Sequence, residues 1–499
     1  MKKKFIFSFI ATACCFLSSC YEDEGNYAYS ELPRFEVDST LVKKAISITQ
    51  FERLQIPSNL VYGGNKADLD FSWSVYRYDP SAYGENVADT IATTENFDQE
   101  ITLQPNKYTL EFSATNRNNG LKSKMRYVLT VESYSGAGLM VFYSKGDHCD
   151  VDIVKTKTLI GSYSQSSVKR NFYTFISGNP KLTGNPIAIS CKSDYLVLVT
   201  DKGAVNTSAN DFSVIRNFDD LFWNAPSVRK PQGFNTIYSY EGHLLVNDGG
   251  VYSLLPSHIQ PVYRDALAMV DDEYYASPYT GYIFGMGIMA YDELKSRFIA
   301  CDLWSGQFKQ ASNGQLRDLG MTQLGLMRGI TMAGGVNYLY SFMKEKADDS
   351  KRHLLLISAG RTETNLSLVN DFDISNLPEI QSAQNYAVSE LSPVFYYSTQ
   401  RSIYLCPFSI DQKTVAKPDA PEWTSPDGED ITHMWLFNIS GIDLPESASH
   451  KYMLVSTYDG AQGRLYILKT DMATGRITSE PIEVFDGFGK IGGVDFKDK

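Results

Sequence analysis

The chain has 499 residues and a formal net charge of −12, from 58 acidic and 46 basic side chains. A surface this acidic argues against nucleic acid as a partner, because neutralising phosphates requires clustered Lys and Arg. The length predicts two or three domains, and the high counts of Tyr (32) and Phe (27) favour strands.

Residues 1–19 have the layout of a secretory signal peptide. Lys2, Lys3 and Lys4 precede an apolar run from Phe5 to Leu17. That run is shorter than the ~20 residues that a transmembrane helix needs. No later segment approaches that length without charges or turn residues, so the sequence predicts an exported and otherwise soluble chain.

The end of this segment, Leu17-Ser18-Ser19-Cys20, resembles the lipobox of bacterial lipoproteins. In that family the cysteine is lipidated and becomes the first residue, so we interpret Cys20 as a lipid anchor and residues 20–35 as a tether. Two or three acyl chains hold a protein stably at a membrane, whereas one chain holds it marginally. The acidic run that follows resembles the signal that sends Bacteroidota lipoproteins to the outer face of the outer membrane; it consists of Glu22, Asp23 and Glu24.

Short alternating runs predict a β-sandwich over residues 36–135. Residues 69–79 alternate as a half-buried strand does, and residues 107–133 read as a β-hairpin. Trp73 on one strand and Tyr108 at the start of another resemble the core tryptophan and tyrosine corner of immunoglobulin-like sandwiches. The hairpin is also similar to the last two strands of a PKD (polycystic kidney disease) domain.

A loose repeat predicts a β-propeller-like domain over residues 136–499. An apolar strand, a turn, a second apolar strand and a glycine turn recur at roughly the spacing of four-stranded propeller blades, about 45 to 55 residues. The units lie at 138–155, 184–203, 233–250, 285–306, 330–360, 392–411 and 431–471. They predict about seven blades, with stacked β-sandwiches as the alternative fold.

Two further elements are expected in this domain. Residues 491–497 read as one more strand, which would complete the first blade and close the ring, removing exposed sheet edges. A helix is predicted at 210–226, because aromatic and aliphatic residues recur there at near-helical spacing. The whole chain is therefore expected to be all-β with little helix.

Local motifs offer no support for an enzyme. No histidine lies in a HExxH pattern, and G-x-S-x-G and Walker A motifs are absent from the sequence. His148 with its neighbouring acids is the densest group of possible ligands, but strand alternation would point adjacent side chains to opposite faces. A carboxylate pair for glycoside hydrolysis would have to come from different blades. We therefore expect no catalytic residue, metal or cofactor.

Four cysteines follow the tether, and each stands alone in an apolar run: Cys149, Cys191, Cys301 and Cys406. They form neither a disulfide framework nor a CxxC pair. We expect them to be buried thiols in the core.

Aromatic residues in segments that read as loops are the candidate ligand-binding residues. Flat aromatic faces with polar neighbours hold sugars, peptides or protein partners, although such rings also cap blade cores. The candidates are Trp223, Tyr274, Tyr275, Tyr279, Trp304 and Trp423.

Lipobox, acidic tether, PKD-like module and β-rich C-terminal domain together resemble the PKD-like family lipoproteins of Bacteroidota. The resemblance implies a lipid-anchored protein that faces the cell exterior on the outer membrane and is accessory to a SusC/SusD-like nutrient-uptake system. The leading hypothesis is non-catalytic capture of a polymeric nutrient, glycan first and peptide second. The alternatives are a propeller-fold hydrolase or lyase, and a structural subunit that docks on an outer-membrane transporter.

Overall fold

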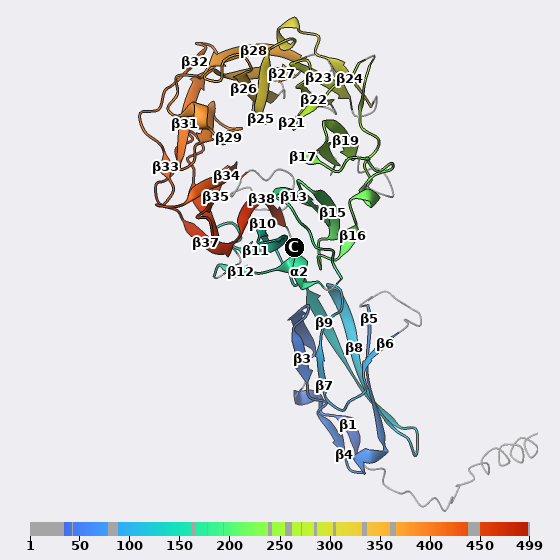
Figure 1. Ribbon diagram of the computed structural model, residues 1–499. Helices are drawn as coiled ribbons and strands as arrows, with labels where there is room; N and C mark the ends of the chain where they lie inside the picture. Colours follow the sequence, from blue (N-terminus) through green and yellow to red (C-terminus); the bar gives the residue numbers. More distant parts are fainter. Residues whose placement is uncertain are drawn as a thin grey trace, which may run out of the picture. The chain divides into compact units, whose positions relative to one another are not determined.

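The computed structural model describes residues 34–41, 43–77, 88–161, 163, 165–176, 178–192, 194–237, 242–254, 262–270, 272–283, 287–302, 306–331, 337–359, 366–437 and 450–497 (Figure 1). The expected signal peptide and the tether residues Cys20, Glu22, Asp23 and Glu24 lie outside these ranges. Within the described part of the chain, no helix combines the length and the apolar character needed to cross a membrane. The chain divides into two compact units, the first ending at Val131 and the second beginning at Glu132.

The first unit is built almost entirely of antiparallel strands. A five-stranded sheet in the order β2-β9-β8-β5-β6 is accompanied by the pairs β3-β7 and β1-β4. The strands are β1 (Phe35–Val37), β2 (Ala45–Thr49), β3 (Arg53–Ile56), β4 (Leu60–Tyr62), β5 (Leu69–Arg77), β6 (Asp89–Ala92), β7 (Phe97–Glu100), β8 (Asn106–Asn116) and β9 (Lys122–Glu132), with 3-10 turns η1 (Ser39–Leu41) and η2 (Lys66–Asp68). The strand expected at 69–79 is β5, and the expected hairpin is β8 with β9.

Trp73 is the centre of the first unit's core. It has no exposed surface, and its ring lies 4.7 Å from that of Phe112 and 5.2 Å from that of Phe97. Its indole N–H donates to the carbonyl of Thr94 at 3.0 Å, so this buried polar group has a hydrogen-bond partner. The Tyr108 hydroxyl donates to a backbone carbonyl four residues upstream, as in a tyrosine corner. The sequence interpretation of both residues is confirmed.

The second unit contains seven sheets among the described residues, which we call blades one to seven. From the innermost strand outward, blades one to three contain β38 (Lys490–Lys497), β10 (Gly138–Lys145), β11 (His148–Lys155) and β12 (Ser167–Lys169); β13 (Pro186–Cys191), β14 (Tyr195–Thr200), β15 (Gly203–Ser208) and β16 (Val214–Arg216); and β17 (Pro231–Ile237), β18 (Gly242–Asn247) and β19 (Gly250–Leu254). In the same order, blades four to seven contain β21 (Ala276–Ile283), β22 (Gly287–Asp292), β23 (Arg297–Asp302), β24 (Gln307–Gln310) and β20 (Ala268–Met269); β25 (Met321–Thr331), β26 (Asn337–Glu345), β27 (Arg352–Ala359) and β28 (Leu366–Asp373); β29 (Asn385–Val388), β30 (Val394–Ser398), β31 (Ser402–Ser409) and β32 (Thr414–Val415); and β34 (Asp430–Leu436), β35 (Tyr452–Tyr458), β36 (Gly463–Lys469) and β37 (Glu483–Phe488). In blade six the two-residue strand β33 (Trp423–Thr424) also pairs with β31.

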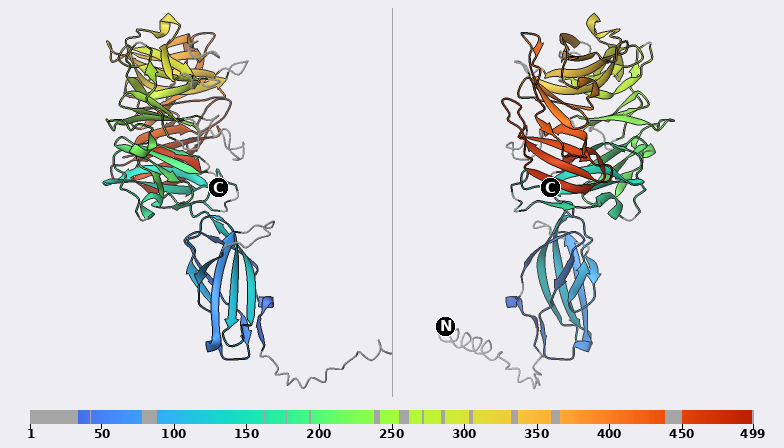
Figure 2. Two further views of the ribbon diagram at one scale, coloured as in Figure 1. Left: turned by 90° about the vertical axis from the view of Figure 1, so that its right-hand side faces the viewer. Right: turned by 60° about the vertical axis from the view of Figure 1, so that its left-hand side comes forward.

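The blades form a ring (Figure 1), shown from two other sides in Figure 2. Each innermost strand contacts the innermost strand of the next blade, and β34 of blade seven contacts β38 of blade one. The last strand, β38, pairs antiparallel with β10, so that the two ends of the second unit share one sheet. The expected closing strand at 491–497 is confirmed, and the blades are not stacked sandwiches.

The inner strands approach one another closely where glycine is present. A Cβ atom on Gly233 of β17 would lie 1.8 Å from the carbonyl oxygen of Pro278 in β21. A Cβ atom on Gly492 of β38 would lie 2.3 Å from the carbonyl oxygen of Pro186 in β13. Both opposing atoms are backbone, so a larger side chain would force the blades apart. Middle strands such as β18 and β22 are buried at every position, which explains their continuous apolar runs.

The helix expected at 210–226 is wrong. The segment contains the strand β16 and the short 3-10 turn η3 (Asp219–Leu221), and the described residues hold one α-helix, α2 (Phe172–Phe175). Phe212 has a positive φ of 61°, and the Asp211 carboxylate accepts from the N–H of Ser213, which favours a turn over a helix. Ile215 is 52% exposed while Phe212 is fully buried, so the spacing does not mark a single apolar face.

No disulfide joins the four described cysteines, and all four are buried. Burial raises the pKa of the Cys149 and Cys406 thiols to about 12. Thiolates are the reactive form of cysteine, so these residues are inert parts of the blade cores, as the sequence predicted.

Candidate ligand-binding surface

Trp223 is the most exposed large aromatic residue among the described residues, with 76% of its surface accessible. It follows η3 in the segment between β16 and β17. Its backbone N–H donates to the carbonyl of Tyr263 at 2.8 Å, and the N–H of Tyr263 donates to Leu221 at 2.7 Å. The preceding Phe222 is buried and packs 5.3 Å from the Tyr263 ring. The backbone is therefore fixed on both sides while the indole remains in solvent.

The segment that carries Trp223 also holds two polar side-chain pairs. The Asn224 amide donates to the Asp265 carboxylate at 2.8 Å. One nitrogen of the Arg229 guanidinium donates to both carboxylate oxygens of Asp219 at 2.8 Å, and the guanidinium stacks 4.9 Å from the Phe218 ring. An aromatic face beside donors and acceptors can stack on an apolar ligand face and hydrogen-bond its hydroxyl or amide groups. We name this set of residues the Trp223 surface: Trp223, Asn224, Asp265, Asp219 and Arg229.

Tyr275 is half-buried and links two blades. Its hydroxyl accepts from Lys230 Nζ and from Gln232 Nε2, both at 3.1 Å. Its ring lies against Gly249, where an added Cβ atom would come within 2.3 Å of a ring carbon. The ring therefore packs at the junction between blades three and four.

Tyr274 is half-buried and Trp423 is buried. The Tyr274 hydroxyl donates to the Leu267 carbonyl at 2.7 Å, and burial raises the pKa of this phenol. Trp423 is 6% exposed, lies in the two-residue strand β33 and packs 5.4 Å from the Tyr466 ring. The Trp423 ring lies in a blade core, and the half-buried Tyr274 ring packs against another.

The remaining candidates differ in position. Tyr279 is 38% exposed and lies on the innermost strand β21, within an irregular stretch of its ladder with β22. Burial raises the pKa of its hydroxyl. Trp304 lies outside the described residues. The structure does not bring the five described candidates together in one site.

The acids beside His148 have separate partners. Asp147 pairs with Lys181 and with His148 Nδ1. Asp152 accepts from Arg170 at 2.7 Å and from the Tyr143 hydroxyl at 2.9 Å. Across the described ranges, no group of three or more His, Cys, Asp or Glu residues has a geometry that could hold a metal ion. These acids connect strands and loops of blade one.

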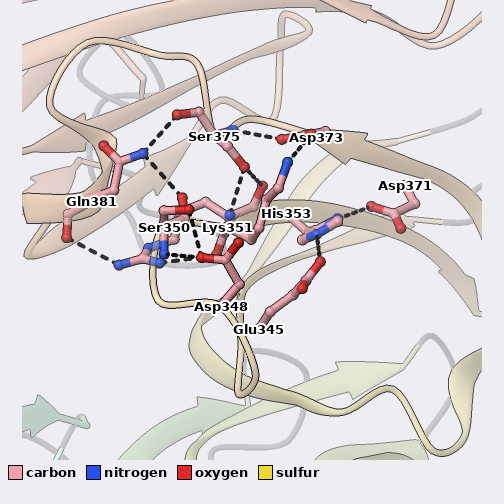
Figure 3. Close-up of polar contacts among 10 residues, drawn as sticks. Glu345, Asp348, Ser350, Lys351, His353, Asp371, Asp373, Ser375 and Gln381 are labelled. Carbon is pink, nitrogen blue, oxygen red and sulfur yellow. Dashed lines mark hydrogen bonds and ion pairs between the residues drawn. The ribbon is translucent and has the colours of Figure 1, made fainter.

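A polar cluster that the sequence did not reveal lies at one end of blade five (Figure 3). His353 Nδ1 is 2.8 Å from Asp371, and its Nε2 is 3.1 Å from Glu345. The hydrogen bond with Asp371 is the main reason why the pKa of His353 is raised. Because the two acids bind opposite nitrogens of the ring, they cannot share one metal ion. The cluster is an ionic clamp across β26, β27 and β28.

Ser190 and His243 form a pair that resembles part of a catalytic dyad. Ser190 Oγ lies 3.4 Å from His243 Nε2, and both residues have no exposed surface. Burial lowers the pKa of His243 to about 3, so the ring is neutral. His243 Nδ1 has no hydrogen-bond partner in the described structure, which means that no acid orients the ring as in a triad. A substrate could not reach this pair.

Comparison with known protein families finds a match in the N-terminal part of the chain. Residues 20–186 match the PKD-like family, so the expected resemblance is confirmed over that range. A search of curated proteins found no match.

Solved structures with a similar trace include a quinoprotein alcohol dehydrogenase-like protein from Bacteroides thetaiotaomicron, with 14% identity, a TM-score of 0.47, and coverage of 94% of this chain and 100% of that one. Hsv2p from Kluyveromyces lactis has 7% identity, a TM-score of 0.38, and coverage of 70% and 98%. PorZ, a surface component of the type-IX secretion system of Porphyromonas gingivalis, has 11% identity, a TM-score of 0.34, and coverage of 73% and 44%. Similarities of this degree transfer no function to this chain.

Proposed function

We propose that this protein is a non-catalytic surface protein whose second unit captures a polymeric ligand, glycan first and peptide second, at the Trp223 surface. The observation that carries the proposal is a 76% exposed indole on a backbone fixed by hydrogen bonds to Tyr263. Leaving so large an apolar face in water is unfavourable, whereas burying it under a ligand is favourable. Loops on a rigid scaffold are also where binding residues concentrate.

The chemistry of the surrounding groups supports a sugar ligand ahead of a peptide. The indole offers a flat apolar face, and the next residue, Asn224, forms with Asp265 a pair that offers a donor and an acceptor. A pyranose ring has an apolar face bordered by hydroxyl groups, so one sugar unit can use both. Because the loop is already ordered, ligand binding would lose little backbone entropy.

The absence of catalysis is part of the proposal. Two observations support a non-catalytic role. The Ser190–His243 pair is buried, and the two acids of the His353 clamp are bound to opposite nitrogens of the His353 ring. A propeller-fold hydrolase or lyase would shorten a glycan on incubation. A capture protein would retain it unchanged.

We place this activity at the outer membrane, with Cys20 as the lipid anchor and a SusC/SusD-like transporter as the uptake partner. The support is the lipobox-like sequence before Cys20, the acids Glu22, Asp23 and Glu24, and the match to the PKD-like family. In this arrangement the first unit would act as a spacer. The competing structural role predicts copurification with a transporter but no retained glycan or peptide.

The proposal is tested by screening residues 21–499 on glycan and peptide arrays, followed by the same screen with Trp223→Ala. Phe175→Ala is the matched control, since Phe175 is 52% exposed and lies in α2, in the connection between blades one and two. Retention that Trp223→Ala abolishes and Phe175→Ala preserves supports the proposal. If the wild-type protein retains no ligand, or if Trp223→Ala retains it equally well, the proposal is wrong. Chromatography of recovered glycan separates capture from cleavage.

A further inference from the structure

One strand of the first unit carries three basic side chains on the face of its sheet that is turned away from the core. Tyr127 and Leu129 of β9 are buried in that core. Side chains alternate along a strand, so Lys122, Lys124 and Arg126 point to the opposite face. All three are exposed. The outer face of the sheet therefore has a row of cations along β9.

A single carboxylate is paired with this row in the described structure. Arg126 lies opposite Glu111 of β8, while the two lysines lie opposite small hydroxyl residues of the same strand. Lys124 Nζ and Arg126 Nε each lie 2.7 Å from the Glu111 carboxylate. Among the described residues, no ion pair or hydrogen bond engages the Lys122 ammonium. The row therefore keeps a positive charge after its internal pairing.

Two more lysines lie beside this row. Lys43 and Lys44 precede the edge strand β2 and are exposed. The carbonyl of Lys44 accepts from the N–H of Val128 at 2.7 Å, so these lysines lie next to β9, near Arg126. We name the five cations the basic surface: Lys43, Lys44, Lys122, Lys124 and Arg126. In a chain with a net charge of −12, this surface gathers charge of the opposite sign, which attracts anions.

The chain enters the first unit at the end that carries Lys122. The ring of Phe35, in the first strand, lies 5.0 Å from the ring of Tyr62. The Tyr62 hydroxyl accepts from Asn116 Nδ2 at 2.7 Å. Asn116 is the last residue of β8 and follows Thr115, which lies opposite Lys122. The tether therefore joins the unit beside one end of the basic surface.

The tether is short enough to hold this end near a membrane. Even fully extended, the segment from Cys20 to Arg34 spans at most about 50 Å. The strand β9 has 11 residues and is about 37 Å long, at about 3.4 Å per residue. With Cys20 anchored as proposed above, the whole basic surface can reach the lipid headgroups.

We propose that the basic surface binds anionic lipid headgroups of the membrane that holds Cys20. A sheet face presents its cations toward one side, which suits a planar layer of phosphates. At about 0.1 M salt the Debye length is about 10 Å, so acids elsewhere on the chain are screened and the local charge decides the interaction. The Lys122 ammonium has three donors for phosphate oxygens, and the terminal nitrogens of the Arg126 guanidinium can bind one phosphate together.

This proposal rests on the membrane location proposed above and not on ligand capture at the Trp223 surface. It gives the first unit a second role besides that of a spacer, because a lipid anchor combined with a basic surface holds a protein at a membrane more firmly than either one alone.

The test is cosedimentation of residues 21–499 with vesicles of phosphatidylcholine alone and with vesicles that also contain about 30% phosphatidylglycerol, at about 0.05 M salt. We expect binding to the anionic vesicles alone, and its loss at about 0.5 M salt. Each basic side chain near an anionic surface strengthens binding about fivefold, so Lys122→Gln should weaken it by that factor, and Lys122→Gln combined with Lys124→Gln about 25-fold. Lys417→Gln is the matched control, since Lys417 is exposed in blade six and its loss changes the net charge equally.

Three results would overturn the proposal. The first is equal binding, or none, to neutral and anionic vesicles. The second is equal affinity of Lys122→Gln and Lys417→Gln for the anionic vesicles, with equal thermal unfolding midpoints showing that both are folded. The third is binding to soluble polygalacturonate without binding to vesicles, which would assign the surface to an anionic polymer. Since residues 21–499 lack Cys20 and the assay contains no captured ligand, none of these results bears on the anchor or on the Trp223 surface.

Discussion

Phe496 in the last strand lies directly opposite Leu139 in the first strand of the ring, across the ladder of β38 and β10. Phe496 is 5% exposed and Leu139 is fully buried, and both belong to the core between blades one and seven. This pair therefore connects the beginning and the end of the second unit by packing as well as by hydrogen bonds.

Phe496→Ala should destabilise the second unit strongly, because it removes a buried ring at the point where the ring of blades closes. Loss of a buried Phe side chain costs about 3–5 kcal/mol. Denaturant unfolding followed by tryptophan fluorescence would measure the change. Lys490→Ala, at the exposed beginning of the same strand, is the control and should leave the midpoint unchanged. Equal midpoints for both variants would show that the closing strand contributes little.

Gly233→Ala should also destabilise the second unit, because the new methyl group would meet the Pro278 carbonyl oxygen at 1.8 Å. The inner strands β17 and β21 would have to separate, at a cost of about 1–3 kcal/mol or more. Gly314→Ala is the matched control, since nothing lies within 4 Å of its added Cβ atom. Thermal unfolding of the two variants would decide the matter: a Gly233→Ala protein as stable as Gly314→Ala contradicts the close approach.

His353 should make stability depend on pH. The pKa of His353 is raised above its ordinary value of 6.5, chiefly by the hydrogen bond with Asp371. The folded state therefore holds the proton more tightly than the unfolded state. The stabilisation is fully present below about pH 6.5 and is lost as pH rises through the higher pKa of the folded protein.

Unfolding free energies of the wild-type protein and of His353→Gln, measured from about pH 6 to about pH 9, provide the test. The difference between the two proteins should shrink as pH rises, and Asp371→Asn should weaken this trend. A difference that stays constant across the range would mean that the clamp does not favour protonated His353.

Much of the fold could be predicted because its signals are local. Alternation around Trp73 predicted β5, and the apolar run at 491–497 predicted the closing strand. Repeated apolar runs predicted about seven blades, because strands buried on both faces have few polar positions. The helix at 210–226 failed for a local reason as well, since the turn at Asp211 and Phe212 overrides the spacing of the apolar residues.

The site could be predicted only in part, because exposure depends on distant segments. Trp223 and Trp423 stand in similar polar, proline-containing stretches, yet one is 76% exposed and the other 6%. Trp423 is covered because β33 pairs with β31 and brings the indole against Tyr466. His353 gave no sequence signal either, because the register of three strands brings its two acids to it.

The most direct test of the central claim is the affinity of residues 21–499 for the glycan or peptide that the arrays select, measured by isothermal titration calorimetry for the wild-type protein and for Trp223→Ala. If the exposed indole is the anchor of the site, its removal should weaken binding about tenfold or more, which corresponds to about 1.4 kcal/mol. Phe175→Ala should bind as the wild-type protein does. An unchanged dissociation constant for Trp223→Ala would contradict the assignment of the Trp223 surface as the capture site.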